Sequence, residues 1–196
     1  MRKILLFSLL SLLLFLAACS QEPIETNMSE TVADFSFTTQ DEETLKLDDL
    51  KGSWWIADFI FTNCTTVCLP MTANMKSLQE EITERDYDVQ LVSFSVDPDY
   101  DTPEVLQEYA ESYEADLSSW TFLTGYDFDT IKELSIKSFR SMVQEPVEGD
   151  EDEQVIHGTN FFLVNPDGKI IKQYDGVQSS ELSNILADLE EIFKAS

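Results

Sequence analysis

Apolar residues follow two different periods along this chain. Residues 34–38 alternate apolar and polar positions, and Leu45 and Leu47 do the same after an acidic turn, which predicts a short N-terminal hairpin. Residues 54–61 form a nearly unbroken apolar run of strand length, as expected for a central strand covered on both faces. Residues 89–96 repeat this pattern. We therefore expect two buried central strands preceded by a hairpin.

Four further segments place apolar residues every three or four positions, which is the period of an amphipathic helix. The second of them begins at Thr102, a typical N-cap residue, and Pro103 follows at the first helical position. The helices are predicted after Pro70 (apolar face Met71, Met75, Leu78, Ile82), from Thr102 to about Tyr113, from Asp127 to Ser138 (Phe128, Ile131, Leu134, Ile136), and after a cap at Ser179 or Ser180 (Leu182, Ile185, Leu189, Ile192).

The order of these elements predicts the fold class. Residues 120–123 form a further short strand, and the turn at 165–168 joins strands 160–164 and 169–174 into a hairpin. Between residues 139 and 155 the pattern lapses, and residues 148–153 are expected to form a solvated acidic hairpin tip. Strands that alternate with helices favour one α/β domain with a mainly parallel central sheet covered on both faces.

The N-terminus has the pattern of a secretory leader. Arg2 and Lys3 precede a continuous apolar run over residues 4–16, and two alanines precede Cys19. This sequence resembles a bacterial lipobox, which implies cleavage before Cys19 and a lipid on its thiol; an uncleaved anchor is the alternative. We expect a lipoprotein signal peptide at 1–18, a flexible tether at 19–30 and a single domain at 31–196, outside the cytoplasm and held at the cell membrane.

The composition excludes one class of partner. Loss of Arg2 and Lys3 with the leader leaves 10 basic and 38 acidic residues, a formal charge of −28. Such a surface repels nucleic acid and anionic lipid head groups, and it attracts cations. Solubility outside the cell or tolerance of high salt explains the same charge. Nucleic acid is therefore not an expected partner, and the chain is expected to be a monomer.

Cys64 and Cys68 are the other two of the three cysteines. A disulfide between them would close a tiny loop and contribute little stability, so redox chemistry or metal binding is the better explanation. They lie between a predicted strand and a predicted helix, where the helix N-terminus favours ionised thiols. Their spacing exceeds the two-residue gap of thioredoxin-like redox motifs and would permit one metal ion to bind both.

His157 is the only histidine of the chain and precedes the strand at 160–164. A solitary histidine is more often a surface or core residue than a ligand. In a thioredoxin-like order, however, the last hairpin lies beside the strand that carries the cysteines. Two thiolates and one imidazole would suit copper or zinc, and three ligands suit a transfer site better than a closed structural site.

Three sequence motifs carry a family resemblance. FTNCTTVCLPMT contains both cysteines, VSFSVDPDYDTP follows the second central strand, and VIHGTNFFLVNPDGK contains the histidine. Together they resemble the Sco/SenC family, over residues 35 to about 192. These are thioredoxin-fold copper proteins that assist assembly of the dinuclear copper (CuA) centre of cytochrome c oxidase. The resemblance implies a thioredoxin-like fold with an N-terminal hairpin, a mixed central sheet flanked by helices and a hairpin insertion before the last strands.

The resemblance also implies functional residues. Cys64, Cys68 and His157 would bind copper, as Cu(I) or Cu(II), and Asp97 would be a loop carboxylate near the site; as a turn residue before Pro98, Asp97 needs no such role. Many members carry proline directly after each cysteine, whereas Thr65 and Leu69 stand here. Soft ligation by Met71 or Met75 is the alternative to core packing, which their helical spacing favours.

Two classes of function remain open on the sequence. The first is a metallochaperone that passes copper to the oxidase subunit carrying the CuA site. The second is a thiol-disulfide oxidoreductase acting on the cysteines of that subunit, or a redox sensor, which would need both cysteines but not His157. Thr62 is also spaced from Cys64 as in peroxiredoxins, but no arginine lies near it in sequence. Whether the protein is an enzyme depends on this choice.

Overall fold

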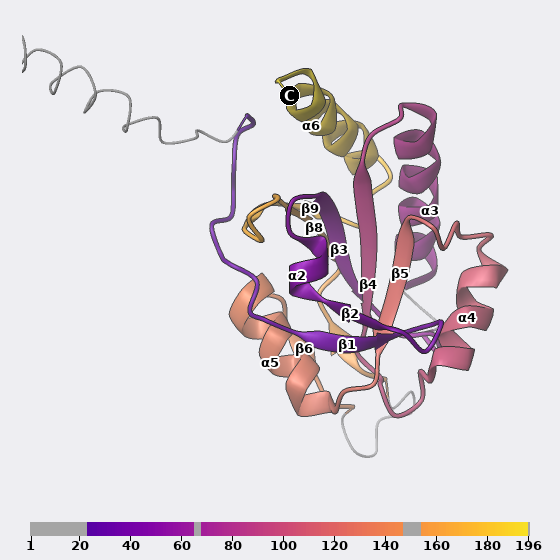
Figure 1. Cartoon of the computed structure of the whole chain (residues 1–196). Coiled ribbons are helices and arrows are strands. Elements are labelled where there is room, and N and C mark those ends of the chain that lie inside the picture. Colours follow the sequence, from indigo (N-terminus) through magenta and orange to yellow (C-terminus); the bar gives the residue numbers. More distant parts are fainter. Residues whose placement is uncertain (1–22, 65–67, 147–153, 196) are drawn as a thin grey trace, which may run out of the picture.

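The computed structural model describes residues 23–64, 68–146 and 154–195 (Figure 1). One mixed sheet has the order β2-β1-β5-β4-β3-β8-β9, and a separate ribbon pairs β6 with β7. The strands are β1 (Ser36–Thr39), β2 (Thr44–Lys46), β3 (Trp54–Ile60), β4 (Val89–Ser95), β5 (Trp120–Thr124), β6 (Val143–Gln144), β7 (Ile156–His157), β8 (Asn160–Val164) and β9 (Ile170–Asp175). The helices are α2 (Leu47–Leu50), α3 (Cys68–Glu84), α4 (Pro103–Ser112), α5 (Phe128–Phe139) and α6 (Glu181–Ala195).

The middle of the sheet is parallel. β3 pairs with β4 in register from Trp54 opposite Val89 to Ile60 opposite Ser95, and β4 pairs in parallel with β5. β8 adds to the other edge of β3 in the antiparallel direction, and β9 follows β8. The two apolar runs read from the sequence are therefore adjacent central strands, as predicted.

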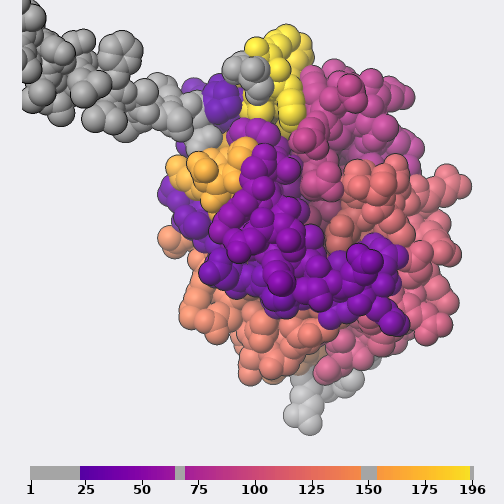
Figure 2. Space-filling model, viewed as in Figure 1, coloured from indigo at the N-terminus to yellow at the C-terminus, as the bar shows by residue number. Residues whose placement is uncertain are grey.

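Two apolar layers enclose this sheet. One layer packs α3, α4 and α6 against one face, and the other packs α2 and α5 against the opposite face. In the space-filling view, the N-terminal hairpin and α2 cover the face turned toward the viewer (Figure 2). The predicted core positions Met71 and Met75 are fully buried in the α3 layer, together with Leu78 and Ile82. Core packing of both methionines is thus confirmed.

The apolar face of α5 differs from the expectation at one position. Ile136 is 48% exposed, whereas Ser135, Ser138 and Phe139 are buried. An α-helix turns by about 100° per residue, so a residue two positions after the buried Leu134 faces away from the sheet. The prediction that Ile136 belongs to the apolar face was therefore wrong, because this rotation turns its side chain away from the sheet.

The segment from 139 to 155, where the sequence pattern lapses, contributes β6, which pairs with β7 directly after it to form a two-stranded ribbon. Val143 in β6 pairs with His157 in β7, antiparallel, and Gly158 donates its backbone N–H to Met142 O at 2.9 Å. This ribbon is the hairpin insertion before the last strands. Its predicted acidic tip at 148–153 lies outside the described residues.

The start of the folded part also differs from the expectation. Ile24 and Met28 are buried, and the N–H groups of Asn27 and Met28 both donate to Ile171 O on β9 at 3.1 Å. From residue 24 onward the chain therefore packs on the domain, where a free tether was predicted. Two apolar residues four positions apart, Ile24 and Met28, are too weak a pattern to distinguish this segment from a linker.

The predicted leader and Cys19 lie outside the described residues. Within the described part, no helix is long and apolar enough to cross a membrane.

The start of α4 allows a first prediction. Thr102 is the N-cap of α4, and its side-chain oxygen accepts from Val105 N–H at 3.4 Å. Replacing Thr102 with alanine is expected to lower the free energy of unfolding by about 1 kcal/mol, because one helical N–H loses its partner. Chemical denaturation measures this change. Ser183→Ala, at an exposed site within α6, should change stability by less than about 0.5 kcal/mol; an equal loss in both variants would contradict the cap.

Candidate metal centre at the cysteine loop

The first predicted ligand, Cys64, follows the end of β3. A turn forms there, in which Cys64 N–H donates to Phe61 O at 3.4 Å, and the Cys64 side chain is 7% exposed. Cys68 is the first residue of α3. Residues 65–67 and the side chain of Cys68 lie outside the described part of the structure. The loop therefore has the predicted strand-to-helix position, and the relation of the two sulfur atoms stays a prediction.

His157 lies against this same turn. Its ring packs edge-on against Phe61, with ring centroids 5.6 Å apart and planes at 84°, and the side chain is 8% exposed. Gln154, three residues earlier, donates from its side chain to Asn63 O at 3.2 Å. The ribbon thus brings the only histidine of the chain beside the cysteine loop, although His157 and Cys64 are 93 positions apart in sequence.

The orientation of His157 defines its ring chemistry. Nδ1 lies 2.9 Å from Gly158 O. A carbonyl oxygen only accepts, so this hydrogen bond requires the proton on Nδ1 and leaves the lone pair of the neutral ring on Nε2. Metal-binding histidines in proteins commonly have this arrangement, with one ring nitrogen donating to a carbonyl while the other binds the metal.

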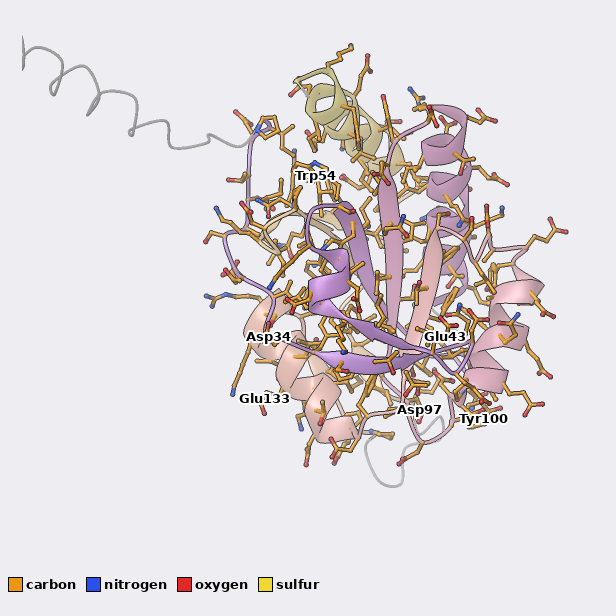
Figure 3. All side chains as sticks on the ribbon, in the orientation of Figure 1. Asp34, Glu43, Trp54, Asp97, Tyr100 and Glu133 are labelled. Carbon is orange, nitrogen blue, oxygen red and sulfur yellow. The ribbon has the colours of Figure 1, made fainter. Side chains whose placement is uncertain are left out.

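Asp97 borders a depression beside the cysteine loop. The depression has a volume of about 380 Å³ and is lined by Phe61, Asn63, Asp97, Asp99, Phe128, Glu145, Pro146, Gln154 and Val155. Asp97 lies at the end of the sheet opposite Trp54, the first residue of β3 (Figure 3). Burial, and then the neighbouring Asp99, raise the pKa of Asp97. Asp97 thus shares this depression with Phe61 and Asn63, and its role near a metal stays a prediction.

The described side chains alone do not form a complete metal site. Among them, no group of three or more His, Cys, Asp or Glu residues is placed to hold a metal ion. The predicted set includes Cys68, whose side chain is not among those described. The donor types nevertheless fit a soft or borderline metal ion, because thiolate and imidazole ligands favour copper and zinc.

Sequence reasoning missed a buried acid in β3, the strand that leads to the cysteine loop. Asp58 in β3 is fully buried, and its Oδ1 accepts from Ser93 Oγ at 2.6 Å, while Trp120 Nε1 donates to Ser93 Oγ at 2.9 Å. Asp58 Oδ2 has no hydrogen-bond partner within the described part of the chain. Burial raises the pKa of Asp58 to about 7, although Ser93 and His157 both act to lower it. The sole charged residue in the apolar run 54–61 was the sequence feature that could have revealed it.

A second missed acid contacts the cysteine loop directly. Asp101 is fully buried, and its carboxylate accepts from the side chain of Thr62 at 2.5 Å and from Ser95 Oγ at 2.5 Å. Burial is the main cause that raises its pKa, and the hydrogen bonds from Ser95 and Thr62 oppose that effect. In sequence this residue was one of several acids of a loop, and nothing distinguished it from its neighbours.

Comparison with known proteins identifies the family. The SCO1/SenC family model matches residues 24–194. The chain belongs to the SCO1/SenC family. This SCO1/SenC protein is 44% identical over 177 residues to the SCO1 protein homolog of Bacillus subtilis, and the match covers 90% of each chain.

Solved structures of the SCO1/SenC family share its architecture. A SCO1/SenC family lipoprotein from Bacillus anthracis has a TM-score of 0.78 and 45% identity, over 82% of this chain and 94% of that one. BsSco, described with a disulfide switch and as a member of the Sco family of cytochrome c oxidase assembly proteins, has a TM-score of 0.76 and 42% identity, over 85% and 95%. Arabidopsis thaliana ScoI, solved with copper bound, has a TM-score of 0.70 and 26% identity, over 84% and 99%. The predicted thioredoxin-like fold, with its mixed sheet flanked by helices, is confirmed.

Proposed function

We propose that this protein is a membrane-anchored, extracytoplasmic copper chaperone that assists assembly of the CuA centre of cytochrome c oxidase. The observation that carries this proposal is the packing of His157 against Phe61 in the turn before Cys64, with the Nδ1 proton directed to Gly158 O. Related proteins solved with copper bound, or described as cytochrome c oxidase assembly proteins, support the cargo and the target.

Each residue of the proposed site would have a distinct role in binding copper. Cys64 and Cys68 would bind the ion as thiolates, and Nε2 of His157 would be the third ligand. Burial of Cys64 and His157 keeps water from the ligands, and the hydrogen bond at Nδ1 fixes the imidazole plane. Three protein ligands leave one position to which an incoming ligand of the acceptor can bind, so that copper passes by ligand exchange.

Anchoring would bring carrier and acceptor together. The lipobox-like sequence before Cys19 supports lipidation at that thiol, and a related structure is that of a SCO1/SenC family lipoprotein. A lipid anchor confines the protein to the membrane in which the oxidase lies, which raises their effective concentration. The strongly acidic domain would stay clear of anionic head groups.

Copper titration of variants tests the ligand set. His157→Ala is expected to reduce copper affinity by about 10- to 100-fold or more, because the site loses its only imidazole. The measurement is an anaerobic titration of the reduced protein, read by the sulfur-to-Cu(II) absorption band that thiolate ligation produces. Met71→Leu and Met75→Leu serve as matched controls and should bind as the wild type does, since both methionines are core residues. Wild-type affinity in His157→Ala would refute the assignment.

A thiol-disulfide oxidoreductase is the second candidate, and the disulfide switch described for BsSco favours it. This function would need the two thiols and not the imidazole. Oxidase assembly in cells separates the two functions. If His157→Ala supports assembly while Cys64→Ser does not, the redox function is the correct one; if both variants fail, copper delivery is.

A further inference from the structure

The buried carboxylate of Asp101 forms a bridge between two loops at the end of the sheet. Thr62 donates its backbone N–H to both carboxylate oxygens, at 3.2 and 3.3 Å, and its hydroxyl to Oδ1 at 2.5 Å. Ser95 donates its hydroxyl to Oδ2 at 2.5 Å. Thr62 precedes Cys64 by two residues, so the bridge ends at the cysteine loop itself.

This carboxylate has no cationic partner among the described residues. Its hydrogen bonds are those from Thr62 and Ser95, and no Lys or Arg of the described part forms an ion pair with it. A buried carboxylate without a counter-charge lowers stability unless hydrogen bonds compensate. An ionised carboxylate only accepts, and its two oxygens can take several donors at once. Asp101 therefore suits the task of holding an N–H and two hydroxyls in fixed positions.

Within the described residues, the backbone of the cysteine loop has no strand-to-strand hydrogen bonds from β4 after it leaves the sheet, so other hydrogen bonds must fix its position. The parallel ladder between β3 and β4 ends with Val96 N–H donating to Ile60 O at 2.8 Å. Thr62 comes two residues later, beyond that ladder. Asp101 supplies the next hydrogen bonds that tie this backbone to the body of the domain, just before the turn that positions Cys64.

The same bridge reaches the loop that carries Asp97. Ser95 Oγ, which donates to Asp101, also accepts from the backbone N–H of Asp97 at 3.1 Å. Asp101 N–H in turn donates to Asp97 O at 2.9 Å. The hydrogen bonds thus run from Thr62 through Asp101 and Ser95 to Asp97, without a gap.

We propose that Asp101 is a positioning residue of the metal centre. It fixes the turn at Cys64 through Thr62 and holds this turn in a defined position relative to the loop of Asp97. Asp101 does not bind the metal in this proposal. Its carboxylate holds the backbone that carries the first thiolate, and the proposal rests on the copper-binding function proposed above. Neither the family resemblance nor the sequence pattern assigns this role.

The test compares three variants of the bridge and one control variant, all as the purified full-length protein. Asp101→Asn and Thr62→Val should each lower copper affinity by about 10- to 100-fold and shift or weaken the thiolate-to-Cu(II) band, as loss of groups that orient ligands does. Thr62→Ser keeps the hydroxyl and should restore both. Thr72→Val is the matched control: it also removes a buried hydroxyl, but this hydroxyl is on α3 and is hydrogen-bonded to Tyr109 at 2.6 Å rather than to Asp101. It should change thermal stability without changing the band or the affinity.

A second measurement needs no copper. In the apo protein, amide hydrogen exchange at Thr62 and Cys64 should be at least about tenfold faster in Asp101→Asn than in the wild type, while exchange at Ile56 within β3 stays unchanged. Unchanged exchange at both loop amides, or wild-type affinity and band in both Asp101→Asn and Thr62→Val, would overturn the positioning role. If Asp101→Asn fails to fold, the copper affinity and the absorption band of Thr62→Val alone test the positioning role. Failure of the wild type to bind copper would instead refute the proposed function, and the exchange data would still decide on Asp101.

Discussion

Asp58→Asn is expected to gain up to about 4 kcal/mol of stability relative to the wild type between pH 4 and pH 8. The cause is the buried carboxyl of β3. Burial raises its folded-state pKa from 3.8 to about 7, so the folded protein keeps the proton over a pH range in which the unfolded chain releases it. Asparagine does not titrate, and its side-chain oxygen can still accept the hydroxyl of Ser93.

The direction in which wild-type stability changes with pH follows from proton linkage. Below about pH 4, Asp58 is protonated in both states and contributes no pH dependence. From pH 4 to pH 7 the unfolded state binds fewer protons than the folded state, so wild-type stability falls as pH rises. Above pH 7 the group is ionised in both states, and the full loss persists at about 1.4 kcal/mol for each unit by which the pKa is raised.

Urea denaturation of wild type and variant at pH 4.5, 6 and 8 measures this difference. The exposed Asp116 is a control of opposite sign, because hydrogen bonds from Ser118 lower its pKa. Asp116→Asn should therefore lose stability relative to the wild type as pH rises from acid to neutral. A stability difference for Asp58→Asn that is constant from pH 4.5 to pH 8 would show that Asp58 does not titrate with a raised pKa.

The elements that the sequence predicted well are those in which one face is buried. The apolar runs of β3 and β4 and the spacing of Met71, Met75, Leu78 and Ile82 in α3 follow directly from burial on one or two faces, because exposing such residues to water is unfavourable. The cap of α4 was also predictable, since Thr102 and Pro103 satisfy the start of a helix by local chemistry alone.

The rest depends on contacts between distant segments. The position of His157 beside Phe61 depends on the β6-β7 ribbon, and the sequence alone does not show this contact. Asp58 and Asp101 differ from other acids of this acidic chain only in being buried, and burial at a single polar residue leaves no period in the sequence. Their donors, Ser93 and Thr62, come from other strands and loops.

Both missed acids lie next to the strand or turn that leads to Cys64. Asp58 is in β3 itself, and Asp101 binds Thr62 just after β3 ends. Each costs stability through burial, since burial is the main cause that raises both pKa values. Two buried acids, one within β3 and one bonded to the residue two positions after β3, thus lower stability close to Cys64, which agrees with a functional site there.

Oxidation of Cys64 and Cys68 to a disulfide is expected to lower copper affinity by at least about 100-fold, because metal binding requires the thiolates. Forming the sulfur–sulfur bond releases two protons and passes two electrons to the oxidant, and neither sulfur then carries the negative charge that binds the ion. The thiol state would thus decide whether the chain carries copper.

The measurement is a copper titration of the same preparation after treatment with diamide and again after reduction with dithiothreitol. Affinity should be lost and then fully recovered, and Cys19→Ser should behave as the wild type does, which excludes the third cysteine. In Cys64→Ser no disulfide can form within the pair, so its weakened binding should not respond to diamide. Unchanged copper affinity in the oxidised wild type would show that the two thiols are not the ligands and would favour the oxidoreductase function.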